Sequence, residues 1–241
     1  MSGLLYKNFR INFYSFLFTV IFAVVCGIEN IVSAALTVPI SSDEQIIISS
    51  STFFCSVYFV FMLVSLIVNT IFQGDENKTC CAFALSVPQG GKGHIEAKYW
   101  YILIQFTTVM FIMFISNTIV FWITDRKVSI TEIIMLLFCI RLFLIAIEIP
   151  FLIRFGSQKG NAIKGLTIIF IIMLIMIYFL FGDISWILKG DNPIIALMEW
   201  LNSGKQILVI SLFTPFSLLA YWLSCRISVR LFKKGTEDYE Q

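Results

Sequence analysis

The chain has 241 residues, of which 59% are hydrophobic and only 13% are charged, with a mean hydropathy of +0.90 and a formal net charge of +2. Soluble domains carry about 25% charged residues and roughly 45–50% apolar residues, so a water-soluble fold of this composition would lack the polar groups to cover its surface. The composition excludes a soluble globular domain and predicts a protein whose surplus apolar surface faces lipid.

Six apolar segments are long enough to cross a membrane as helices. A bilayer core of about 30 Å needs about 20 helical residues, and continuous apolar runs favour helices over the alternating strands of a barrel. We therefore expect an all-α polytopic membrane protein that forms a single transmembrane domain over residues 1–241. The predicted spans cover about 13–37, 49–72, 99–123, 130–153, 163–182 and 206–227.

The placement of the basic residues favours a topology with both termini in the cytoplasm. Of the 17 Lys and Arg residues, twelve fall in segments that this topology places inside, four fall in outer loops, and Arg141 lies within a span. This is the bias that the positive-inside rule describes. The inner residues are Lys7, Arg10, Lys78, Lys92, Lys98, Arg154, Lys159, Lys164, Arg226, Arg230, Lys233 and Lys234, and the outer ones are Arg126, Lys127, Lys189 and Lys205.

Two segments outside the spans have an amphipathic or apolar character. Residues 1–12, read with the start of the first span, place Leu5, Phe9 and Phe13 four residues apart, which indicates a short amphipathic helix at the cytoplasmic interface or, as the alternative, a frayed polar end. Residues 183–205 form an outer loop that is unusually apolar. They predict a helical excursion before the sixth span that either dips into the membrane or lies on its surface.

Familiar catalytic and metal-binding motifs are missing from the sequence. There is no G-x-S-x-G, H-E-x-x-H or G-x-x-x-x-G-K-[ST] pattern, so neither ester hydrolysis nor ATP hydrolysis is expected in this chain. His94 has no second histidine to join it and is interpreted as a solvated loop residue. The six cysteines are interpreted as reduced thiols, and the adjacent Cys80 and Cys81 lack a second pair to form a metal site. We expect no metal and no cofactor in the chain.

Three ionisable residues, Glu29, Arg141 and Glu148, fall inside apolar spans. An unpaired charge there costs at least about 2.5–3.5 kcal/mol, so either a structural ion pair or a functional role is expected, with the ion pair favoured. At 1.5 Å per residue, Arg141 lies ~5 Å from the depth of Glu29 and ~10 Å from Glu148. We therefore predict a Glu29–Arg141 pair, within one subunit or across a dimer, with Glu148 in the cytoplasmic third of the bundle near a kink at Pro150. Three polar residues are expected to hydrogen-bond between helices: Asn69, Ser116 and Asn117.

The segment between the second and third spans carries a family resemblance. It contains Asp75-Glu76, then Leu85-Ser86-Val87-Pro88 before a glycine-rich break, then Ile95-Glu96-Ala97-Lys98-Tyr99-Trp100. An acidic residue, a Leu-x-x-Pro turn and an Ala-Lys-Tyr start to the third span resemble the ABC-2 type of ABC transporter permease, especially the small bacterial permeases of this length. The resemblance extends in topology over nearly the whole chain. One departure is Cys80-Cys81-Ala82, where family members often carry a bulky residue, so the boundaries of the coupling helix stay open.

The resemblance implies a partner that hydrolyses ATP. In such permeases the segment after the second span is a coupling helix that docks in a groove of a separate ABC ATPase subunit, which binds ATP and Mg; here it would cover about Asp75 to Val87. The alternative is an ordinary solvated loop. The resemblance further implies two permease copies with two ATPases in the bacterial cytoplasmic membrane. The residues that would face the ATPase are Asp75, Glu76, Lys78, Phe83, Leu85 and Pro88.

The expected cargo is amphipathic, because a Phe-rich translocation surface with few charges suits a peptide or a lipid better than an ion or a sugar. Among the small ABC-2 permeases, exporters of antimicrobial or cytolytic peptides, including phenol-soluble modulins, are the closest match. Membrane lipids are the other expected partners, and nucleic acid is not one. Two alternatives are a substrate-binding membrane subunit for vitamin uptake, which would need a compact polar pocket, and an intramembrane enzyme, for which Glu29 and Glu148 are the only candidate acids.

Overall fold

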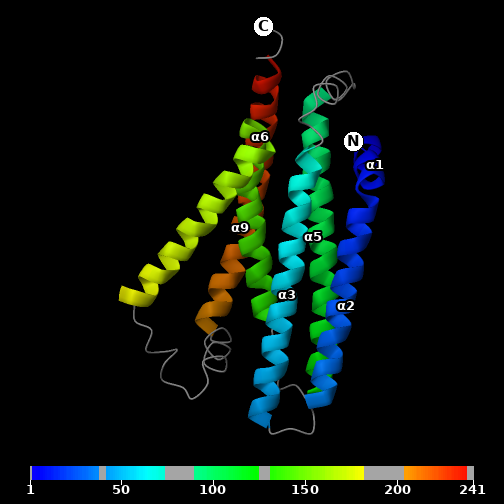
Figure 1. Cartoon of the computed structure of the whole chain (residues 1–241), viewed down its shortest axis with the longest axis vertical. Coiled ribbons are helices and arrows are strands. Elements are labelled where there is room, and N and C mark those ends of the chain that lie inside the picture. The colour runs from blue at the N-terminus through cyan, green and yellow to red at the C-terminus, as the bar shows by residue number, and fades with distance from the viewer. Residues whose placement is uncertain (1, 38–41, 74–89, 125–130, 182–203, 238–241) are drawn as a thin grey trace.

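The computed structural model describes residues 2–37, 42–73, 90–124, 131–181 and 204–237, and within these ranges every element is a helix (Figure 1). The helices run up and down, roughly side by side, with α5 packed against each of the others. In chain order they are α1 (Ser2–Ile11), α2 (Phe13–Thr37), α3 (Ser42–Gln73), α5 (Gly90–Ile123), α6 (Thr131–Phe181) and α9 (Gly204–Glu237).

Five helical segments in the described part of the chain are long and apolar enough to cross a membrane: Phe13–Leu36, Ser51–Phe72, Gly90–Ile123, Ile134–Gly156 and Ile210–Lys233. Their apolar windows are only 22–50% buried within the chain, so many large apolar side chains point outward. Such a surface requires lipid around it. The predicted polytopic all-α membrane fold is therefore confirmed. The predicted span at 163–182 falls in the second half of α6, which stays helical to Phe181.

Several helices extend beyond the spans that hydropathy predicts. The helix of the third span begins at Gly90 instead of 99, and α9 continues ten residues past 227 to Glu237. At 1.5 Å per residue, the 34 residues of α5 are about 51 Å long, well beyond a hydrocarbon core of about 30 Å. Hydropathy marks only the part of a helix that lies in lipid, and these helices continue into the polar region outside it.

The predicted fourth and fifth spans form one element with a sharp break. The backbone of α6 is non-helical at Gly156, with φ 78° and ψ 172°, and two helical halves meet there. The break lies six residues beyond the predicted kink at Pro150, and Pro150 itself lies inside the first half. Proline removes one hydrogen-bond donor but keeps a helical φ, whereas the backbone angles of Gly156 are open essentially to glycine alone. In Figure 1 the second half of α6 turns back at this point and diverges from α3.

Both termini lie at one end of the bundle (Figure 1). We call this the terminal end; it holds α1, the last turn of α3 at Gln73, the first turns of α5 at Gly90 and the last turns of α9. Basic residues of the described helices gather there, because Lys7, Arg10, Lys92, Lys98, Arg226, Arg230 and Lys233 all belong to these parts of the chain. If both termini are in the cytoplasm, as the sequence predicts, the whole terminal end of the bundle faces the cytoplasm.

The core lies around α5. Two of the hydrogen bonds between helices that the sequence predicted are found there. Phe106 of α5 is fully buried, and its ring stacks on Phe61 of α3 at 5.5 Å. Ser116 Oγ donates to the carbonyl of Gly27 at 3.0 Å, and Asn117 Nδ2 donates to Thr131 Oγ1 at 3.0 Å, as predicted. The side chain of Asn69 lies outside the described part of the structure.

The amphipathic N-terminal helix is confirmed as α1, and Leu5 and Phe9 pack against the core while Phe13 is 51% exposed. The four cysteines within the described ranges, Cys26, Cys55, Cys139 and Cys225, are free thiols. The predicted outer excursion at 183–205 lies almost wholly outside the described residues.

Candidate functional site

The predicted coupling residues Asp75, Glu76, Lys78, Phe83, Leu85 and Pro88 lie outside the described residues, so their roles stay a prediction. The structure does describe the two helix ends that flank them. These ends are Gln73 of α3 and Gly90 of α5, and both belong to the terminal end of the bundle (Figure 1). A movement of the segment between them would reach the rest of the bundle through the contacts of these two helix ends.

Lys98 joins α5 to the end of α3. Its side chain is buried at 4% exposure, and Nζ donates to the main-chain carbonyl of Ile71 at 2.6 Å. The same ammonium lies 4.8 Å from the ring centroid of Phe72. The last carbonyls of a helix lack partners within that helix and carry partial negative charge. Lys98 therefore caps α3 with a charged hydrogen bond from a neighbouring helix.

Tyr99 joins α5 to α9. Its hydroxyl shares hydrogen bonds of 2.7 Å with Ser224 and with Ser228, and the hydroxyl of Tyr221 donates to the carbonyl of Tyr99 at 2.7 Å. All four residues are buried. The three partners on α9 occur at spacings of three and four, so they lie on one face of that helix. A buried network in which each hydroxyl has a partner holds two helices in one arrangement.

We call the group Lys98, Tyr99, Tyr221, Ser224 and Ser228 the clamp. Its two members on α5 belong to the Ala97-Lys98-Tyr99 sequence on which the family resemblance rested. Sequence reasoning missed the three members on α9. The signal that would have found them is a polar stripe, with Tyr221, Ser224 and Ser228 on one face of an otherwise apolar span.

His94 lies beside the clamp and corrects a prediction. The expected solvated loop residue is 5% exposed in α5, with its ring 6.2 Å from that of Phe232 on α9. The prediction failed because Gly90, Gly91 and Gly93 suggested a loop. In the structure Gly91 and Gly93 are buried within the helix, and residues without side chains permit close packing there.

The same part of α5 holds the N-terminal helices. The hydroxyl of Tyr101 donates to the carbonyl of Asn12 at 3.2 Å, and its ring lies edge-on to Phe9 at 4.9 Å. One turn further, Gln105 Nε2 donates to Thr19 Oγ1 on α2 at 3.0 Å. Two turns of α5 thus contact α1, α2, α3 and α9, so a displacement of α5 at the terminal end reaches all four helices.

The intramembrane charges pair differently from the prediction. Arg141 Nη1 lies 3.5 Å from Glu148 Oε1, and the two residues are 7% and 9% exposed. The predicted Glu29–Arg141 pair within one subunit was therefore wrong, and Glu29 is exposed on the outward face of α2. The prediction counted only the reach of Arg141. The side chain of Glu148 also extends toward Arg141 and covers part of the two-turn gap.

These features are those of a multi-pass helical membrane protein in which α5 holds the other helices together at one end of the bundle. The sequence model of the ABC-2 family transporter proteins matches residues 44–233, which run from α3 into α9 and include the clamp. The chain therefore belongs to the ABC-2 transporter family and is a membrane subunit of an ABC transporter. No curated protein and no solved structure matches it.

Proposed function

We propose that this chain is the permease subunit of an ABC exporter, driven by a separate ABC ATPase that docks on the segment from Asp75 to Val87. The observation that carries the proposal is the clamp. Lys98 ties the helix before this segment to the helix after it, and Tyr99 ties the latter to α9. Because the ends of α3 and α5 are bonded to one another, a force applied to the segment between them would move both helices together.

The transmission follows the contacts of α5. When two ATPases close on ATP, a movement of residues 74–89 displaces the terminal ends of α3 and α5, and the clamp carries α9 with them. Tyr101 and Gln105 carry α1 and α2. The first half of α6 packs in the core, and Gly156 separates it from the second half. The second half of α6 therefore need not move with the other helices. ATP and Mg belong to the partner subunit.

Glu29 supports a complex with two copies of this chain. It lies exposed on α2 within an outward face that also holds Val25, Ile28 and Val32. Ionisable residues in membrane spans almost always face the interior of a bundle or a water-filled cavity, because a carboxylate in lipid is costly. A second copy packed on this face would remove Glu29 from lipid, and two-fold symmetry is the usual solution for such assemblies.

The cargo that fits the described surface is amphipathic. The outward faces carry many large apolar side chains, including Phe18, Phe59 and Phe111, while Arg141 and Glu148 are paired and buried. Export of a peptide or a lipid from a bacterial cytoplasmic membrane is the function that this surface and the family favour. A vitamin-uptake subunit is disfavoured, because the family match includes the segment after the second span.

Purification from native membranes tests the proposal. A tagged chain should copurify with an ABC ATPase, and native mass spectrometry should give a mass of two permease and two ATPase chains. Glu76→Lys and Leu85→Asp should each reduce the recovered ATPase and its hydrolysis rate at least tenfold, equivalent to ~1.4 kcal/mol of association. Glu44→Lys, at the opposite end of α3, is the matched control and should change neither. Normal ATPase recovery by both loop variants would refute the docking segment.

A further inference from the structure

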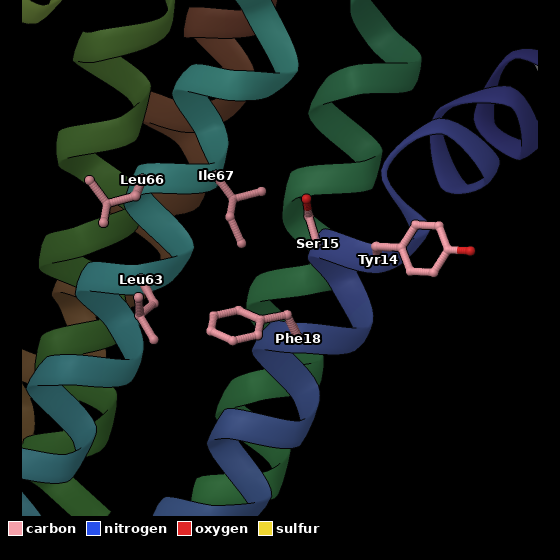
Figure 2. A pocket seen from close by; sticks show the side chains of 6 residues that line it. All are labelled: Tyr14, Ser15, Phe18, Leu63, Leu66 and Ile67. Carbon is pink, nitrogen blue, oxygen red and sulfur yellow. The ribbon is translucent and has the colours of Figure 1, made fainter.

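A groove opens between α2 and α3 toward the terminal end of the bundle (Figure 2). It has a volume of ≈ 490 Å³, and its lining is largely apolar. In Figure 2 the ring of Phe18 extends from α2 toward Leu63 on α3, with Leu66 and Ile67 further along α3. The lining residues are Tyr14, Ser15, Phe18, Leu63, Leu66 and Ile67.

The groove is held open by contacts on both sides. The first turns of α2 are held on α5, because Phe16 lies 5.5 Å from Phe9 in the aromatic group with Tyr101, and Thr19 accepts from Gln105. The end of α3 is held on α5 by Lys98. Further from the terminal end, α2 and α3 meet directly, with Ser56 Oγ donating to Asn30 Oδ1 at 3.3 Å. Two helices that touch at one end and are anchored to a third helix at the other leave a space between them.

The helix that forms one wall is graded in chemistry along its length. Lys7, Arg10, Tyr14 and Phe18 follow one another at spacings of three and four, so they form one stripe. Hydrogen bonds from Asn12 N to Asn8 O and from Phe16 N to Asn12 O carry the helix across the join of α1 and α2. Arg10 is exposed, Tyr14 is 83% exposed and Phe18 is 57% exposed.

This order matches one molecule of the bilayer. From the terminal end inward, the stripe holds cationic groups, then Tyr14, whose ring points away from α3 in Figure 2, then the ring of Phe18 in the apolar groove. A phospholipid presents an anionic phosphate, then a glycerol backbone, then acyl chains. Basic residues beside a membrane attract anionic headgroups, and tyrosine is enriched at the headgroup level.

We propose that this groove is a binding site for an anionic phospholipid, with one acyl chain against Phe18, Leu63 and Leu66 and the headgroup beside Arg10 and Lys7. The positive charges of the stripe favour an anionic headgroup over a zwitterionic one. The apolar lining of the groove suits an acyl chain. The site does not depend on docking of an ATPase, so it stands or falls separately from the proposed function.

Photo-crosslinking from inside the groove tests the site. The full chain carries p-benzoylphenylalanine in place of Phe18 and is reconstituted in nanodiscs of equal phosphatidylglycerol and phosphatidylcholine. The matched control carries the same crosslinker in place of Phe111, which is 65% exposed on α5 with no Lys or Arg within one turn. Mass spectrometry of the adducts identifies the lipid that each position captures.

At position 18 we expect phosphatidylglycerol adducts to exceed phosphatidylcholine adducts at least threefold, and at position 111 we expect nearly equal amounts. Arg10→Gln with Lys7→Gln should bring the ratio at position 18 close to one, whereas Arg226→Gln on α9 should leave it unchanged. Equal adducts of both lipids at position 18 in the otherwise unmutated chain would overturn the proposal without reference to any variant. A crosslink from position 18 to a second copy of the chain, in place of lipid, would overturn it as well.

Discussion

Replacing either Arg141 or Glu148 with glutamine is expected to destabilise the folded chain by about 3–5 kcal/mol, because each change strands the other charge in a buried site. The pair joins Nη1 to Oε1 at 3.5 Å, with exposures of only 7% and 9%. The double variant should recover part of the loss, since it leaves no charge behind. Reversible unfolding in mixed detergent and lipid, followed by circular dichroism, measures all three variants.

The matched control for this pair is the exposed salt bridge of Lys92 and Glu96 on α5, which lie 3.9 Å apart with side-chain exposures of 54% and 24%. Lys92→Gln should cost no more than about 0.5 kcal/mol, as is usual for an exposed pair one helical turn apart. If the losses of Arg141→Gln and Glu148→Gln add fully in the double variant, the two side chains do not interact and the observed pairing is refuted.

Gly156→Ala is expected to destabilise the chain by about 1–3 kcal/mol, the cost of holding a side chain in backbone angles that essentially only glycine adopts. The φ of 78° at this residue sets the corner between the two halves of α6. The control is Gly165→Ala in the second half of the same helix, where nothing lies within 4 Å of an added Cβ and no positive φ occurs.

In the control, alanine should be neutral or stabilise the helix by up to about 1 kcal/mol. Thermal unfolding of the two variants side by side gives the comparison. Equal responses at Gly156 and Gly165 would show that the corner does not depend on the backbone freedom of glycine.

The membrane fold was predictable because lipid imposes a simple physical requirement. Apolar runs of about 20 residues must form helices with their hydrogen bonds satisfied internally, and the helices occur where the runs are. The helix ends were less predictable, because outside lipid no such requirement applies. Gly90 begins α5 nine residues before the apolar run, and Gly156, where the two halves of α6 meet, was not singled out because Pro150 is the stronger sequence signal.

The sequence located two residues of the clamp but could not predict their partners. Lys98 and Tyr99 stand in a motif that the resemblance to ABC-2 permeases singled out. Their partners lie 27 residues away at Ile71 and 125 and 129 residues away at Ser224 and Ser228. Only the packing of α3, α5 and α9 brings these groups together. The pairing of Arg141 was predicted wrongly because the depth count included the reach of only one of the two side chains.

Docking of a partner ATPase on the segment from Asp75 to Val87 requires the terminal end of the bundle to face the cytoplasm, and cysteine labelling in intact cells tests this most directly. In a cysteine-free chain, single cysteines at Gln89 and Thr236 should be protected from an impermeant thiol reagent added outside. Those at Ser42 and Asn192, which the predicted topology places outside, should react. Labelling at Gln89 from outside, with Ser42 protected, would place the terminal end outside the cell and contradict docking of an ATPase there.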